Sequence, residues 1–169
     1  MFTDIQLLQI KNAVMRALHV PGNYRGGILE MAVAVDYHMD CGLLREECSQ
    51  LAAALKRADD IFRNVRLNLI KWVSDDEIIK EVSSLPALQL GKGFEDYGPE
   101  RADGGKSLDE LLRQLKLFYA RSKIIILITD GSYRRVDEGK IREYLNPFLG
   151  RKLVVVTSGR VSSGREWLL

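Results

Sequence analysis

The stretch Lys123-Ile124-Ile125-Ile126-Leu127-Ile128-Thr129-Asp130-Gly131 decides the fold class of this chain. Its five consecutive branched apolar residues are typical of a parallel strand that is buried on both faces of a sheet. Similar runs predict further strands at residues 30–36, 66–73 and 153–157. Amphipathic helices are expected between these strands, at 42–58, from Ser107 onward, and at 137–146. This alternation predicts an α/β fold, a three-layer, doubly wound and mostly parallel sheet.

The 169 residues are enough for a single domain, and we expect one. Residues 1–20 would hold an N-terminal helix over 3–18, which begins at the capping box Thr3-Asp4-Ile5-Gln6. Residues 30–157 would form the core and residues 158–169 a tail.

Two segments between the expected strands are less regular. Residues 76–84 fit either a helix or an antiparallel edge strand, because Ile78, Ile79 and Val82 suit both periodicities. Residues 86–105 contain five of the 14 glycines and two of the four prolines. We therefore expect a long, mobile loop there, since the segment has few apolar anchors for its length.

The composition is that of an ordinary soluble domain, with 46% hydrophobic and 28% charged residues and a net charge of +2. Such a small charge indicates neither a nucleic-acid nor a membrane partner. The first residues do not resemble a secretion signal, and no apolar run approaches the roughly 20 residues of a membrane span. Cys41 and Cys48, seven residues apart, have neither a metal-site nor a disulfide-framework spacing. These features predict a cytoplasmic location.

Polar residues cluster where the expected strands end. Asp36, His38 and Asp40 follow the first strand, and Asp130 follows the strand at 123–129. The segment Gly104-Gly105-Lys106-Ser107 opens a helix. In doubly wound sheets, sites form at the carboxyl ends of the strands, so we expect these side chains to converge.

The order of these clusters resembles the metal-ion-dependent adhesion site of von Willebrand factor type A (vWA) domains, over about residues 30–157. In that family, an Asp-x-Ser-x-Ser strand end, a Gly-Gly-Thr loop and a Thr-Asp-Gly strand end come together. Thr129-Asp130-Gly131 matches well, Gly104-Gly105 matches in part, and Asp36 matches the leading aspartate. The resemblance implies that the expected strands lie across the sheet in the order 66–73, 30–36, 123–129, 153–157. These are the second, first, fourth and fifth along the chain when the segment 76–84 is counted as the third. It also implies a non-enzymatic protein-interaction or scaffold role, with a MoxR-type AAA+ ATPase as the partner. The last strand and helix of the family would be lacking here.

The site departs from the family pattern at the residues that would bind Mg²⁺. His38 and Asp40 replace the two serines, and Lys106 replaces the threonine. A protonated lysine cannot ligate a metal, but it can neutralise carboxylates that would otherwise repel each other. We therefore predict that Lys106 pairs with Asp36, Asp40 or Asp130 and that no cofactor binds. The alternative is a metal-dependent, hydrolase-like enzyme or a metal-binding vWA domain, in which Asp36, His38, Asp40 and Asp130 hold a divalent cation such as Mg²⁺ or Mn²⁺.

Two other motifs fail on particular residues. Gly105-Lys106-Ser107 resembles the end of a P-loop, but Glu100 stands where the first glycine is required and no strand precedes it. Asp36 could start a haloacid-dehalogenase-type site, but His38 stands where the second aspartate is needed.

Overall fold

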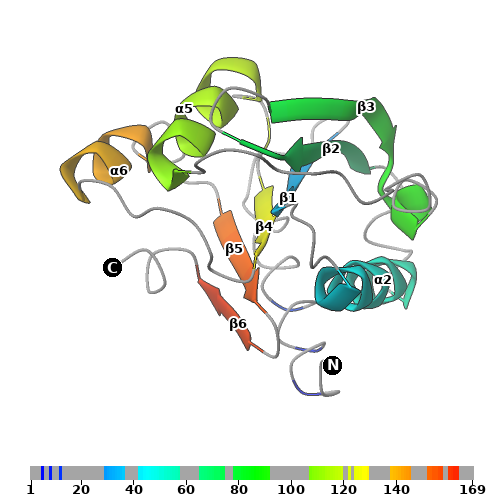
Figure 1. The fold of residues 1–169 in the computed structure, drawn as a ribbon. Coiled ribbons are helices and arrows are strands. Elements are labelled where there is room, and N and C mark those ends of the chain that lie inside the picture. The colour runs from blue at the N-terminus through cyan, green and yellow to red at the C-terminus, as the bar shows by residue number, and fades with distance from the viewer. Residues whose placement is uncertain are drawn as a thin grey trace.

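Strands and helices alternate along the chain in the computed structural model (Figure 1). The structure describes residues 29–36, 42–57, 65–74, 78–91, 107–119, 122, 124–129, 138–145, 152–157 and 160–163, together with Ile5, Leu8 and Asn12. The elements in chain order are β1 (Leu29–Asp36), α2 (Gly42–Arg57), β2 (Val65–Trp72), β3 (Ile78–Pro86), the 3₁₀ turn η1 (Ala87–Gln89), α5 (Leu108–Phe118), β4 (Ile124–Ile128), α6 (Glu138–Leu145), β5 (Lys152–Thr157) and β6 (Arg160–Ser163).

The described strands form one sheet of six, in the order β3-β2-β1-β4-β5-β6. The four inner strands are parallel, and β3 and β6 pair antiparallel at the two edges. Met31 is in register with Ile124 and Val35 with Ile128, so β1 and β4 are adjacent parallel strands, as the expected strand order requires. This confirms the α/β class.

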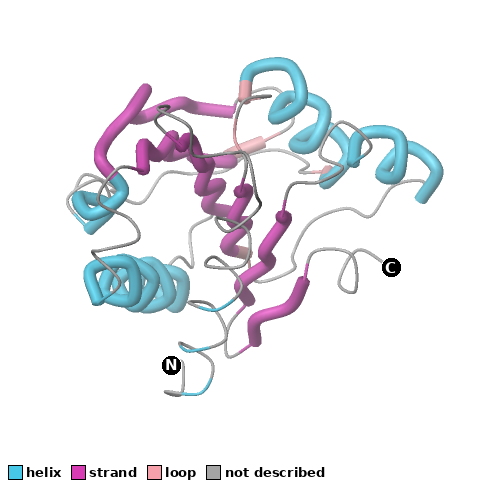
Figure 2. The backbone as a smooth tube through the Cα atoms, turned by 180° about the vertical axis from the view of Figure 1, so that it is seen from behind, coloured by secondary structure: helices cyan, strands magenta, loops and turns pink. Residues whose placement is uncertain are grey.

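Helices lie on both faces of the sheet (Figures 1 and 2). One face packs against α5, whose buried residues recur every three or four positions. This cluster consists of Ala32, Ala34, Ile70, Trp72, Ile125 and Leu127 from the strands, and Leu108, Leu111, Leu112, Leu115 and Tyr119 from α5 and its end. Full burial of a leucine or isoleucine side chain stabilises the fold by about 1.5–3 kcal/mol, so this cluster is a major part of the core.

The opposite face of the sheet is covered by α2, which buries Cys48, Leu51, Ala52 and Leu55. The η1 turn contacts both α2 and β2. None of the helices in the described part of the chain is long and apolar enough to cross a membrane.

In three segments the secondary structure settles or differs from what the sequence predicted. The segment 76–84, which periodicity left open, contributes residues 78–84 to the edge strand β3. The expected long loop does not begin at residue 86, because 87–91 are helical and bury Ala87 and Leu90 beside the sheet. The pattern did not predict β6, a short strand within the expected tail.

Some expectations fall partly or wholly on undescribed residues. Residues 92–106 lie outside the described part of the chain, and with them the expected mobility of that segment. Of the expected N-terminal helix, only Ile5, Leu8 and Asn12 are described, and each is helical.

Candidate functional site

Three neighbouring strands end together at the carboxyl edge of the sheet. Asp36 is the last residue of β1 and is in register with Trp72, the last residue of β2. On its other side, Val35 is in register with Ile128, so Asp36 and Thr129 are the next residues along β1 and β4. The two apolar strands β1 and β4 therefore place the Asp36 carboxylate and the Thr129 hydroxyl next to each other at the carboxyl edge of the sheet.

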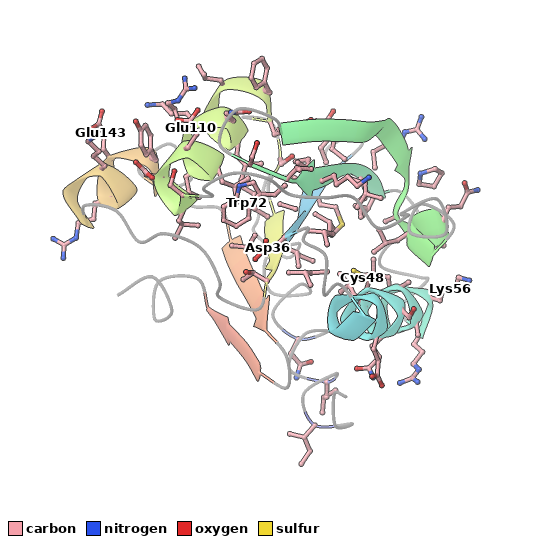
Figure 3. All side chains as sticks on the ribbon, in the orientation of Figure 1. Asp36, Cys48, Lys56, Trp72, Glu110 and Glu143 are labelled. Carbon is pink, nitrogen blue, oxygen red and sulfur yellow. The ribbon has the colours of Figure 1, made fainter. Side chains whose placement is uncertain are left out.

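A hydrogen bond joins these two strand ends. The Thr129 hydroxyl donates to Asp36 Oδ2 at 2.5 Å, across 93 residues of sequence, and both residues are 0% exposed. Figure 3 labels Asp36 at this position between the helical layers. Burial of a carboxylate is costly unless it is hydrogen-bonded, and a bond of this length is typical of a hydroxyl donating to a charged acceptor. The Thr129 hydroxyl thus stabilises the buried Asp36 carboxyl group.

The first turn of α5 also belongs to this edge. Residues 119–123 alone separate the end of α5 from the start of β4, so α5 begins toward the carboxyl ends of the strands. Ser107 is its N-cap residue, with 5% of its surface exposed and an extended backbone. The Ser107 carbonyl accepts a bond of 3.3 Å from the Leu111 amide. Asp36 points to the α5 side of the sheet, because Ala32 and Ala34, two and four residues earlier, pack against α5.

The structure therefore places two of the eight predicted site residues, Asp36 and Ser107, at the carboxyl edge on the α5 side. The others lie outside the described residues: His38, Asp40, Gly104, Gly105, Lys106 and Asp130. The pairing of Lys106 with a carboxylate accordingly stays a prediction. Within the described part of the chain, no group of three or more His, Cys, Asp or Glu side chains is arranged to hold a metal ion.

Two further residues at this edge were not predicted as site residues. Thr129 was part of the matching motif, but nothing in its spacing indicated that it would donate to Asp36. Lys71 lies one residue before the end of β2 and is 2% exposed. A lysine in an alternating strand is ordinarily assigned to a solvent-facing position, so its burial could not be inferred from the pattern.

The ion pair of α5 joins Glu110 of its first turn to Arg113, and both side chains are partly exposed to solvent. The Arg113 guanidinium donates to Glu110, with Nε to Oε2 at 2.9 Å, and this hydrogen bond is the main cause of the lowered pKa of the Glu110 carboxyl. Lys116 lies over the Tyr144 ring of α6, with 6.0 Å between the ammonium nitrogen and the ring centroid. These contacts stabilise the helical layer and do not form part of the candidate site.

No protein-family model matches the sequence, and no curated protein matches it closely enough to count as a relative.

Proposed function

We propose that the chain is a non-enzymatic protein-interaction or scaffold domain of vWA type, with the three-layer, doubly wound architecture of that family. The observation that carries the proposal is the hydrogen bond between Thr129 and Asp36. It links the first and the last of the three motifs on which the resemblance rests. The strand order β2-β1-β4-β5 supports the proposal further, because it is the order that the resemblance implies.

In this proposal, an internal ion pair replaces the metal of the family site. Three carboxylates, Asp36, Asp40 and Asp130, come from strand ends that meet at one edge, and close carboxylates need a counter-charge. Lys106 precedes the buried Ser107 and stands where the family has a metal ligand. Its ammonium supplies the positive charge without a cofactor.

The partner that fits this proposal is another protein. In the family, the carboxyl edge is the surface that binds the partner, and for a cytoplasmic domain of this kind a MoxR-type AAA+ ATPase is the proposed partner. The loops after the strands would make the contact, while the Asp36–Thr129 bond holds two of the strand ends together.

Metal binding tests the site directly. We expect the purified chain to contain no stoichiometric metal and to show no tight binding of Mg²⁺, Mn²⁺ or Zn²⁺ by calorimetry. Lys106→Thr removes the ammonium and restores the family hydroxyl, so it should raise affinity for Mg²⁺ or Mn²⁺, whereas Lys56→Thr on the exposed face of α2 should not. Tight divalent binding by the unmutated chain that Asp40→Asn abolishes would instead support the metal-dependent alternative.

Partner binding tests the functional class. An affinity capture with the full chain, analysed by mass spectrometry, should recover an AAA+ ATPase. The same capture with Lys106→Met should lose that partner, and Lys56→Met should keep it. Capture that is equal for both variants would show that the partner does not bind at the carboxyl edge.

A further inference from the structure

The last turn of α5 carries two large apolar side chains that are exposed to solvent. Leu117 is 59% exposed and Phe118 is 72% exposed, whereas the other apolar residues of this helix are buried. A single exposed apolar residue is ordinary, but adjacent ones form a patch, and such patches often mark interaction sites. The 11 residues of α5 span about 16 Å, so this apolar pair lies well away from the carboxyl edge, where α5 begins (Figure 1).

Polar side chains one turn earlier border the apolar pair. Residues three and four apart are neighbours on a helix, so Arg113 and Gln114 lie beside the pair. The Glu110 carboxylate orients both of them. Its Oε2 accepts a hydrogen bond from Arg113 Nε at 2.9 Å, and its Oε1 accepts one from Gln114 Nε2 at 3.2 Å. Protein interfaces share this arrangement, because they combine an apolar centre with a polar rim and are enriched in arginine and aromatic residues.

The charge beside the apolar pair is positive. Both acidic residues of α5 lie in its first turn, and Glu110 is already paired with Arg113. Lys116 is the basic residue of the last turn. Its ammonium lies over the Tyr144 ring, and within the described part of the chain it has no carboxylate partner. An acidic ligand is therefore complementary to this surface.

The same charge argues against a second copy of this chain as the ligand. Most homodimers have two-fold symmetry, so a dimer built on the apolar pair would bring the last turns of two α5 helices together. The two Lys116 ammonium groups would then lie close to each other, and like charges placed together at an interface are unfavourable. An acidic amphipathic helix avoids this repulsion, because its apolar face can cover the pair while its carboxylates approach Lys116.

We propose that the last turn of α5 is a second interaction surface, which binds an acidic amphipathic helix of a partner protein. Apolar side chains of that helix cover Leu117 and Phe118, and its carboxylates pair with Lys116. The surface does not include the carboxyl edge, so this proposal goes beyond the proposed function and does not depend on it.

Binding of synthetic peptides to the full chain tests the proposal by fluorescence anisotropy. The probe is a labelled peptide of about 18 residues, long enough to form a helix, with leucine every three or four positions and glutamate on both flanks. The control peptide has lysine in place of every glutamate. We expect the acidic peptide to bind at least about tenfold more tightly than the basic one, with a difference that shrinks at high salt.

Variants of the exposed residues locate the binding surface. Leu117→Ser and Phe118→Ser should each weaken binding of the acidic peptide by at least about tenfold, because each removes an apolar side chain that the complex buries. Lys116→Glu should weaken it by a few-fold at low salt. Lys56→Glu reverses the charge of an exposed lysine on α2 and is the matched control, with affinity unchanged.

Several results would overturn the proposal. These are equal affinity for the two peptides, or undiminished binding of the acidic peptide by Phe118→Ser. Dimerisation in sedimentation experiments that Phe118→Ser abolishes would identify a second copy as the ligand instead. Binding to anionic lipid vesicles that Phe118→Ser abolishes, without binding of the acidic peptide, would identify a membrane surface. None of these results alters the metal and capture experiments on the carboxyl edge, so failure here is distinguishable from failure of the proposed function.

Discussion

The hydroxyl of Thr129 offers a sharp test of how the carboxyl edge is held together. Thr129→Val removes the donor to Asp36 Oδ2 and keeps the shape of the side chain. Both residues are 0% exposed, so water cannot replace the lost bond without a rearrangement. Loss of a hydrogen bond to a buried acceptor costs about 1–3 kcal/mol, and hydrogen bonds to charged groups lie toward the upper end. We expect Thr129→Val to lower the free energy of unfolding by about 2 kcal/mol.

Ser122 provides the matched control within the same chain. Ser122 is also 0% exposed, but its hydroxyl oxygen has no hydrogen-bond partner among the described residues. Removal of a buried polar atom that makes no bond relieves its desolvation cost, so Ser122→Ala should be neutral or stabilising. The two variants thus separate the effect of losing a buried hydroxyl from the effect of losing the bond to Asp36.

Urea unfolding followed by far-UV circular dichroism and by the fluorescence of the buried Trp72 gives the required free energies. With a slope of about 2 kcal/mol per molar urea, the expected loss corresponds to a midpoint lower by about 1 M. A loss below about 0.5 kcal/mol for Thr129→Val would refute the argument, because such values are ordinary for surface substitutions. An equal loss for Ser122→Ala would refute it as well.

Two further predictions concern α5. Leu112→Ala should cost about 2–5 kcal/mol, because Leu112 is 1% exposed within the core cluster, whereas Leu117→Ala, at 59% exposure, should stay within about 0.5 kcal/mol in the same unfolding assay. Burial raises the pKa of Tyr119 above the ordinary 10.0, so an alkaline absorbance titration should show a late phenol that Tyr119→Phe removes. Because the folded state favours the neutral phenol, this contribution to stability is fully present below about pH 10 and is lost as the pH rises through the raised pKa. A pH dependence that is identical in Tyr119→Phe would contradict this assignment.

Two of the inner strands, β1 and β4, could be predicted from the sequence because nearly all of their described residues are buried on both faces of the sheet. Ile124–Ile128 has no polar position at all, and Met31–Val35 is equally continuous, so a one-residue error in either would not change the assignment. Their adjacency required more than periodicity. It was expected from the strand order that the family resemblance implies, and the register of Val35 with Ile128 confirms it.

The edges of the sheet were harder to predict, for identifiable reasons. The pairing of β3 with β2 has register shifts on both sides of Leu69, and such irregularities break the alternation on which strand prediction relies. The β6 strand, Arg160–Ser163, has four residues and one apolar side chain, too few to give a periodic signal. Ala87 and Leu90 were assigned to a loop because Pro86 precedes them and glycines follow, yet both are buried.

At the candidate site, the sequence could indicate which strand ends meet but not which side chains become buried there. Asp36 was predicted at the correct edge, whereas its contact with Thr129 depends on the register of two strands far apart in the chain. The burial of Lys71 depends on what lies above β2 and β1, which the local pattern does not encode.

Asp36 and Lys71 are the buried charged residues of the described carboxyl edge, and they lie on opposite faces of the sheet. Their burial separates the residues that stabilise this edge from those that a partner protein could contact. Asp36, hydrogen-bonded to Thr129 on the α5 side, and Lys71 on the α2 side are both inaccessible to a partner protein. Substitutions at these residues act first on stability, because each leaves a buried polar or charged group uncompensated. In the proposed function, recognition of a partner comes from residues outside this buried set, such as His38. A His38 variant that alters partner capture without lowering the urea midpoint would show this division, and a variant of Asp36 that altered capture at unchanged stability would argue against it.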